Sequence, residues 1–130
     1  MIGLVLVTHA GLATALIASA EMIVGPIETC RTVEVAPDER ADDIMAHVIE
    51  AVESVQADGA IIMTDLFGGT PSNMSMSFLK EGLVEVITGV NLPMLIEFCS
   101  RRERVPLTHL AADLQRTGRE GIIVAGELLK

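Results

Sequence analysis

Met1-Ile-Gly-Leu-Val-Leu-Val-Thr-His-Ala-Gly11 opens the chain, and the remaining segments are arranged around it. Residues 2–7 form a short apolar run rich in β-branched side chains, which is typical of a strand buried on both faces. The run stops at Thr8 and His9, and Gly11 opens a segment of small residues with helical character. Ligands in open α/β sheets bind at the carboxyl ends of parallel strands. We therefore predict that His9 lies at such an edge as a reactive group.

The composition limits the classes of function. A chain of 130 residues predicts a single domain spanning residues 1–130, long enough for a full hydrophobic core. The 9 basic and 18 acidic residues give a net charge of −9, which argues against nucleic acid and anionic membranes as partners. Cys30 and Cys99 show no metal-type spacing, so we expect no metal site and interpret both residues as buried free thiols in a reducing cytosol.

The uncharged first 20 residues also resemble a secretory signal. Such a signal begins with positive charge and continues as an unbroken apolar core. Here no Lys or Arg precedes Glu21, and Thr8 to Gly11 interrupt the apolar run. No other stretch reaches the roughly 20 apolar residues of a membrane-spanning helix. A strand followed by a helix explains the segment better, and we expect a cytoplasmic protein.

Strands and helices alternate along the chain. The pattern predicts helices at residues 11–24, 42–56, 71–80 and 92–102, and a further helix from Pro106 with Gly118 beyond its end. The first helix is apolar around most of its circumference and is expected to be well buried. Predicted strands follow at residues 27–35, 60–63 and 83–88, with a short C-terminal strand at 121–126. This order predicts a three-layer α/β sandwich with a mainly parallel sheet and a C-terminal antiparallel edge strand.

Polar residues follow two of the predicted strands. His9 ends the first strand and Asp65 follows the third, so neighbouring strands of one sheet would bring them together. A carboxylate that accepts a hydrogen bond from one imidazole nitrogen fixes the tautomer and leaves the other nitrogen as a nucleophile. His47 and His109 fall on polar helix faces and are interpreted as exposed surface.

The glycine-containing segment Gly68-Gly69-Thr70-Pro71-Ser72 is the third part of the candidate site. Paired glycines permit a tight turn, and Thr70 or Ser72 would cap the following helix. A helix N-terminus with free N–H groups suits a phosphate. No Lys follows the glycines, so the segment is not a Walker loop for ATP. Together with His9 and Asp65, it predicts phosphoryl transfer through a phosphohistidine, without a cofactor or metal.

Other interpretations of these residues remain open. A histidine after a strand is often purely structural. A receiver domain would carry acidic residues where Thr8 and His9 stand, and a serine hydrolase would carry a G-x-S-x-G elbow, which the chain lacks. Phe67, Met74 and Met76 flank the site as a candidate docking patch, although the methionines suit the core equally well. Phe67 precedes two glycines, and we predict that it is partly exposed.

At this point the sequence resembles the enzyme IIA domain of the mannose family of the bacterial sugar phosphotransferase system (PTS), also written EIIA of the mannose/fructose/sorbose family. The resemblance covers the whole chain. It rests on the opening segment 2–11, on Thr64-Asp-Leu-Phe-Gly-Gly-Thr-Pro-Ser-Asn73 and on Gly89-Val-Asn-Leu-Pro-Met94, in this order.

The resemblance implies that His9 accepts a phosphoryl group from phosphohistidine on HPr and passes it to a histidine of a separate IIB component. Asp65 would orient the His9 ring, and Thr70 with neighbouring N–H groups would hold the phosphate. The resemblance also implies a homodimer that exchanges the strand at 121–126, with the membrane involved only through IIC and IID components. Two alternatives share these residues: a regulatory module whose phosphorylation controls a protein partner, and the phosphotransfer subunit of dihydroxyacetone kinase.

Overall fold

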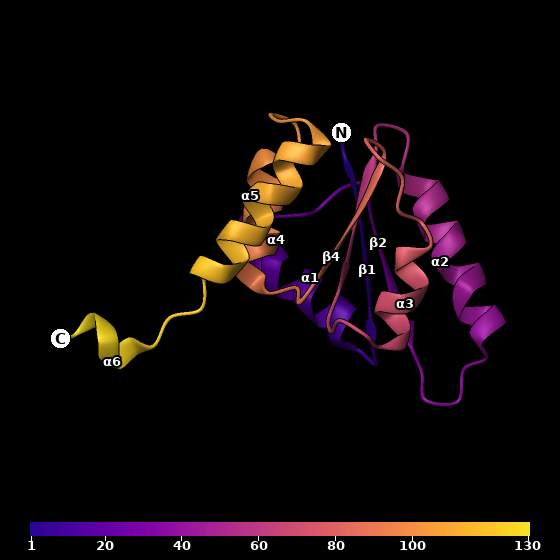
Figure 1. The fold of residues 1–130 in the computed structure, drawn as a ribbon, viewed down its shortest axis with the longest axis horizontal. Coiled ribbons are helices and arrows are strands. Elements are labelled where there is room, and N and C mark those ends of the chain that lie inside the picture. Colours follow the sequence, from indigo (N-terminus) through magenta and orange to yellow (C-terminus); the bar gives the residue numbers. More distant parts are fainter.

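Four parallel strands form the middle layer of the computed structural model, which describes residues 1–130 (Figure 1). The strands are β1 (Gly3–His9), β2 (Cys30–Val35), β3 (Ala60–Thr64) and β4 (Val84–Thr88), and their order in the sheet is β2-β1-β3-β4. The two central strands, β1 and β3, pair from Gly3 opposite Ala60 to Val7 opposite Thr64. The residues that follow each of these strands therefore meet at one edge of the sheet.

Helices cover both faces of the sheet (Figure 1). On one face lie α1 (Leu12–Val24), α4 (Leu92–Arg101) and α5 (Leu107–Glu120), and on the other lie α2 (Ala41–Val55) and α3 (Thr70–Met76). A short helix, α6 (Ala125–Leu128), stands apart from this body. The predicted α/β sandwich with a parallel sheet is confirmed.

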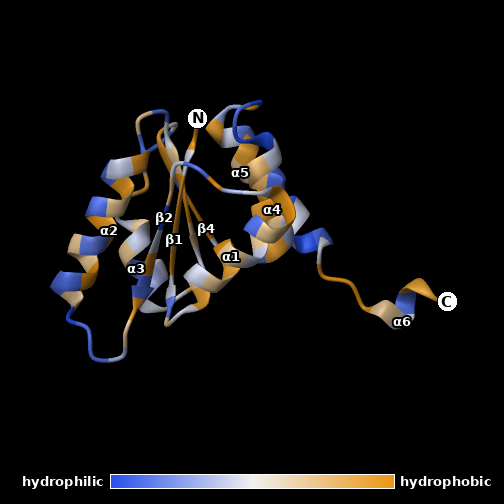
Figure 2. Ribbon diagram, turned by 180° about the vertical axis from the view of Figure 1, so that it is seen from behind, coloured by the Kyte–Doolittle hydropathy of each residue, from blue (hydrophilic) through white to orange (hydrophobic).

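Strand β1 connects two separate hydrophobic cores. Leu4 and Leu6 pack into the core beneath α1, α4 and α5, whereas Val5 and Val7 pack into the core beneath α2. All four side chains are fully buried. Burial of each of these side chains stabilises the folded state by about 1.5–3 kcal/mol. This gain explains why the apolar run at residues 2–7 forms a central strand of the sheet. In Figure 2 the central strands are correspondingly hydrophobic and α2 carries hydrophilic turns on its outside.

Arg102 anchors the amino ends of β1 and β2, at the edge of the sheet opposite His9. Its guanidinium donates hydrogen bonds to the carbonyl oxygens of Ile2 (3.0 Å from Nε and 2.6 Å from Nη2), Glu28 (2.8 Å) and Thr29 (3.1 Å). The guanidinium carbon also lies 4.7 Å from the centre of the Phe98 ring. Arg102 thus donates to three carbonyls, of which only that of Thr29 also accepts from a strand amide, that of Leu4. The sequence pattern does not indicate this role.

The single chain does not form the C-terminal strand expected at 121–126. Residues 122–124 leave α5 in an irregular conformation, α6 follows, and every residue from Gly121 to Lys130 is exposed. The physical reason is the direction of the chain: α5 ends with Gly121 against Pro93 of α4, and the segment that follows extends away from the body (Figure 1). The apolar side chains of Ile122, Ile123 and Val124 remain 61–76% exposed.

Three helices also differ from expectation. In α1 only Ala13 and Ala20 are buried and Met22 is 90% exposed, because the helix lies on the surface with one face against the sheet and α4. Helix α3 ends at Met76 rather than at residue 80. Helix α5 continues past Gly118, where a Cβ would lie 2.9 Å from the Met94 methyl group; this glycine permits close helix packing and does not end the helix.

Candidate active site

His9 is the last residue of β1, and its side chain is 50% exposed at the carboxyl edge of the sheet. The chain turns sharply behind it, because Ala10 adopts a left-handed conformation with φ of 48°. The Ala10 amide donates to the Val35 carbonyl of the neighbouring strand at 3.0 Å, and the Thr8 hydroxyl accepts from the Ala13 amide at 2.8 Å, which ties down the start of α1. A left-handed conformation is uncommon outside glycine and is maintained here by these surrounding contacts.

Asp65 lies beside His9 because β1 and β3 are neighbours in the sheet. Its Oδ2 is 2.9 Å from Nδ1 of the His9 ring and accepts a further hydrogen bond from the His9 backbone amide at 3.0 Å. The Asp65 side chain is only 13% exposed. The hydrogen bonds of the His9 ring involve Nδ1 alone, so Nε2 remains available at the rim.

The charge of Asp65 determines which ring nitrogen of His9 carries the proton. Burial raises the pKa of this carboxyl, but the hydrogen bonds from the His9 amide and ring lower it, and the net shift is downward. Asp65 is therefore an ionised acceptor at neutral pH and requires a proton on Nδ1. In the neutral ring the lone pair is then on Nε2, the nitrogen that faces away from Asp65.

The segment Gly68–Ser72 lies next to the His9 ring. A Cβ at Gly69 would stand 3.0 Å from Cε1 and 3.4 Å from Nε2 of His9, so a residue without a side chain leaves room at that nitrogen. Gly68 has φ of 90°, in the left-handed region that favours glycine. The amides of Gly69, Thr70 and Ser72 donate to no backbone acceptor. Such amides at the start of a helix suit an anion.

The expected roles of two hydroxyl groups in this segment need correction. Gly69, not Thr70 or Ser72, occupies the N-cap of α3, and no side chain caps the helix. Ser72 is fully buried, and its hydroxyl lies 4.0 Å from the sulfur of Met76. Ser72 is therefore not available at the surface, contrary to the expectation that it binds phosphate, whereas Thr70 is exposed.

Apolar side chains flank the histidine rim. Phe67 is 71% exposed, in agreement with its position before two glycines, and its neighbour Leu66 is 60% exposed. Met74 is half-buried and packs against the core beneath α2, so its position fits the core interpretation better than a docking role. The exposure of Leu66 was not anticipated, because its sequence context gives no signal beyond its place in the same loop.

Other candidate groups lie away from His9. His47 and His109 are exposed, and the His47 ring is 3.1 Å from a Glu39 carboxylate oxygen. Cys30 and Cys99 are free and half-buried, and burial raises the pKa of the Cys30 thiol to about 11. No group of three or more His, Cys, Asp or Glu side chains is arranged to hold a metal ion. None of the helices combines the length and apolar character needed to cross a bilayer.

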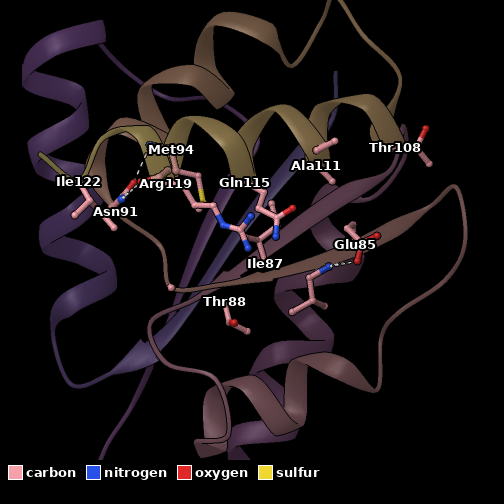
Figure 3. A pocket seen from close by; sticks show the side chains of 14 residues that line it. Glu85, Ile87, Thr88, Asn91, Met94, Thr108, Ala111, Gln115, Arg119 and Ile122 are labelled. Carbon is pink, nitrogen blue, oxygen red and sulfur yellow. Dashed lines mark hydrogen bonds between the residues drawn. The ribbon is translucent and has the colours of Figure 1, made fainter.

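The largest cavity lies elsewhere, as a groove of about 650 Å³ along the free edge of β4 (Figure 3). Strand β4 lines one side through residues 85–88, and α5 lines the other through side chains that include Thr108, Gln115 and Arg119. The reactive candidate, His9, instead stands on an open rim. An open rim suits contact with another macromolecule better than enclosure of a small ligand.

A parallel α/β sandwich with an oriented histidine, a buried carboxylate and free amides at one sheet edge defines a candidate phosphoryl-accepting domain. The model of the family described as "PTS system fructose IIA component" matches residues 3–115. The chain belongs to this family, the EIIA components of mannose, fructose and sorbose phosphotransferase systems.

Individual relatives agree with this assignment. The sorbose-specific EIIA component of Lacticaseibacillus casei is 30% identical over 118 residues, which cover 90% of this chain and 86% of that protein. The mannose-specific EIIAB component of Escherichia coli strain K12 is 32% identical over 124 residues, which cover 93% of this chain and 38% of that protein. A crystal structure of EIIA from Streptococcus agalactiae shares the fold with a TM-score of 0.89, at 24% identity over 98% of this chain and 99% of that one.

Proposed function

We propose that the chain is a phosphocarrier in which Nε2 of His9 accepts a phosphoryl group from phosphohistidine on HPr and passes it to a histidine of a IIB component. The observation that carries this proposal is the 2.9 Å contact between Nδ1 of His9 and Oδ2 of Asp65, which leaves Nε2 as the free nitrogen. Membership of the EIIA family supports the same reaction class.

The transfer step balances without any additional reactant. The Nε2 lone pair of His9 attacks the phosphorus, and the bond between phosphorus and the donor imidazole nitrogen breaks, returning its electron pair to the donor ring. His9 then carries both the phosphoryl group on Nε2 and the proton on Nδ1, so its ring is positively charged. The Asp65 carboxylate stabilises this charge through the hydrogen bond at Nδ1. The onward step to IIB is the same reaction in reverse.

The phosphoryl oxygens would be held by the amides of Gly69 and Thr70, with the exposed Thr70 hydroxyl beside them. Preorganised donors that meet the developing negative charge are the main catalytic contribution in such a site. Gly68 supplies the turn and Gly69 supplies the space beside the ring. Phe67 and Leu66, both exposed at the same rim, would contact the protein partners.

A homodimer is the second part of the proposal. The edge of β4 is free, a groove lies along it, and residues 122–124 of the same chain are apolar and exposed. Pairing of this segment with β4 of a second copy would cover both features, as an added antiparallel strand. We expect a dimer in size-exclusion chromatography with light scattering, and a monomer when the chain ends at Glu120.

The test of the carrier role is phosphorylation of the purified protein with enzyme I, HPr and phosphoenolpyruvate, followed by intact mass measurement. We expect one acid-labile phosphoryl group on the wild type and none on His9→Gln. His47→Gln and His109→Gln are matched controls, because both histidines are exposed away from the site and should leave the gain in mass unchanged. Phosphorylation of His9→Gln to the wild-type level would contradict the proposal.

A further inference from the structure

The turn after β4, residues 89–91, lies against the end of β3, one residue before Asp65. The amides of Gly89 and Val90 both donate to the carbonyl oxygen of Thr64, at 2.9 and 3.0 Å. The strand pairing ends with Thr64 opposite Thr88, so these two bonds continue the contact beyond the last paired residues.

These two hydrogen bonds restrain the main chain of Asp65. A peptide group is planar, so the Thr64 carbonyl lies in the same plane as the amide nitrogen and Cα of Asp65. Holding the carbonyl oxygen from two sides therefore fixes the direction in which Asp65 leaves the strand.

No other side chain fixes the direction of the Asp65 carboxylate. Its Oδ2 accepts both hydrogen bonds from His9, and its Oδ1 is buried without a partner. Apart from His9, which it orients, the carboxylate is contacted only by the main chain of Asp65 itself. Its own position must therefore come from the main chain, and the turn at 89–91 holds that main chain.

Asn91 ties this turn to two helices. Its side-chain oxygen accepts from the Met94 amide at 3.1 Å and caps α4, and its amide nitrogen donates to the Gly118 carbonyl of α5 at 2.9 Å (Figure 3). A Cβ at Gly118 would lie 3.6 Å from the Asn91 oxygen and 2.9 Å from the end of the Met94 side chain, so α5 lies close against the turn at this glycine.

We propose that Asn91 is a positioning residue for phosphoryl transfer at His9. It acts through the turn 89–91, the Thr64 carbonyl and Asp65, and it touches neither His9 nor the phosphoryl group. This inference rests on the proposed function, because it assigns Asn91 a part in the same transfer reaction.

The test compares the imidazole nitrogen signals of His9 by NMR in the unphosphorylated protein, together with the rate of transfer from phospho-HPr. Asn91→Ala removes both hydrogen bonds. Asn91→Asp keeps an acceptor for the Met94 amide, so α4 stays capped, but it loses the donor to Gly118 and keeps the fold testable. In both variants we expect the neutral His9 ring to shift from the Nδ1–H tautomer towards a mixture of the Nδ1–H and Nε2–H tautomers. We also expect phosphoryl transfer from phospho-HPr to slow about tenfold to a hundredfold.

Val55→Ala is the control for a loss of stability alone. Val55 is the last residue of α2 and is buried beside Gly3, at the opposite end of the sheet, so its truncation destabilises the fold without touching the turn. We expect this variant to keep the wild-type tautomer and transfer rate. Wild-type His9 signals in both Asn91 variants, or the same tautomer shift in Val55→Ala, would overturn the positioning role. A wild type that takes no phosphoryl group would refute the proposed function, and the tautomer comparison would still decide the role of Asn91.

Discussion

Removal of the negative charge from Asp65 should slow phosphoryl transfer in a graded way. In Asp65→Asn the amide oxygen can replace Oδ2 and keep both contacts with His9, so only their charge assistance is lost. Hydrogen bonds to a charged group contribute about 1.5–3 kcal/mol and neutral ones about 0.5–1.5 kcal/mol. Only the bond to the ring strengthens during transfer, because the ring becomes positively charged, so the lost charge assistance is worth about 1–1.5 kcal/mol, which corresponds to a rate loss of roughly tenfold. Asp65→Ala removes the acceptor altogether and should lose about a hundredfold or more.

The assay is rapid quenching of the reaction between phospho-HPr and each variant, at protein concentrations below saturation. Asp58→Asn is a matched control, because it makes the same change at an exposed carboxylate that binds the N-terminal amine. The order of rates should be wild type and Asp58→Asn first, then Asp65→Asn, then Asp65→Ala. Equal rates for all four proteins, or a faster Asp65→Ala than Asp65→Asn, would refute the proposed role of the carboxylate.

Three further predictions follow from individual contacts. Gly69→Ala places a methyl group 3.0 Å from Cε1 of His9 and should slow transfer about tenfold, while the melting temperature stays near the wild-type value. The control is Gly126→Ala, where a Cβ meets nothing within 4 Å; its transfer rate should equal that of the wild type. Arg102→Met leaves the carbonyls of Ile2 and Glu28 without their donor and should lower the free energy of unfolding by about 2–4 kcal/mol, measured by urea denaturation. An unchanged urea midpoint would exclude the anchoring role of Arg102. The folded-state pKa of Asp65 is lowered, so its stabilising contribution is present above the ordinary carboxyl pKa and is lost as the pH falls through the folded value. The free energy of unfolding should accordingly fall less for Asp65→Asn than for the wild type between neutral and acidic pH. An equal fall in the free energy of unfolding of the two proteins would contradict this prediction.

The central part of the fold could be predicted from local patterns because burial there is unambiguous. The apolar run at residues 2–7 and the shorter run at 60–63 are buried on both faces, and each stops at a polar residue that marks the sheet edge. The C-terminal segment could not be predicted in this way. Residues 122–124 have the composition of a strand, but a strand needs a neighbour, and the chain directs this segment away from the free edge of β4.

The candidate site likewise combines features that the sequence predicts with features that it does not. The approach of Asp65 to His9 follows from the pairing of β1 with β3. Alternation with helices indicates a parallel sheet, but it does not specify which strands are neighbours. The orientation of Ser72 towards the core and the cap at Gly69 depend on the rotation of α3, which a helix of seven residues with few apolar positions does not specify. The hydrogen bonds from the turn 89–91 to Thr64 join residues about 25 positions apart, and no local pattern records such contacts.

The most direct measurement of the central claim is heteronuclear NMR of the phosphorylated, nitrogen-15-labelled protein. Coupling between phosphorus and a ring nitrogen identifies the atom that bears the phosphoryl group. The geometry at Asp65 predicts coupling to Nε2 of His9, with the proton retained on Nδ1. Coupling to Nδ1 of His9, or to a ring nitrogen of another histidine, would contradict the proposal that Nε2 of His9 carries the phosphoryl group.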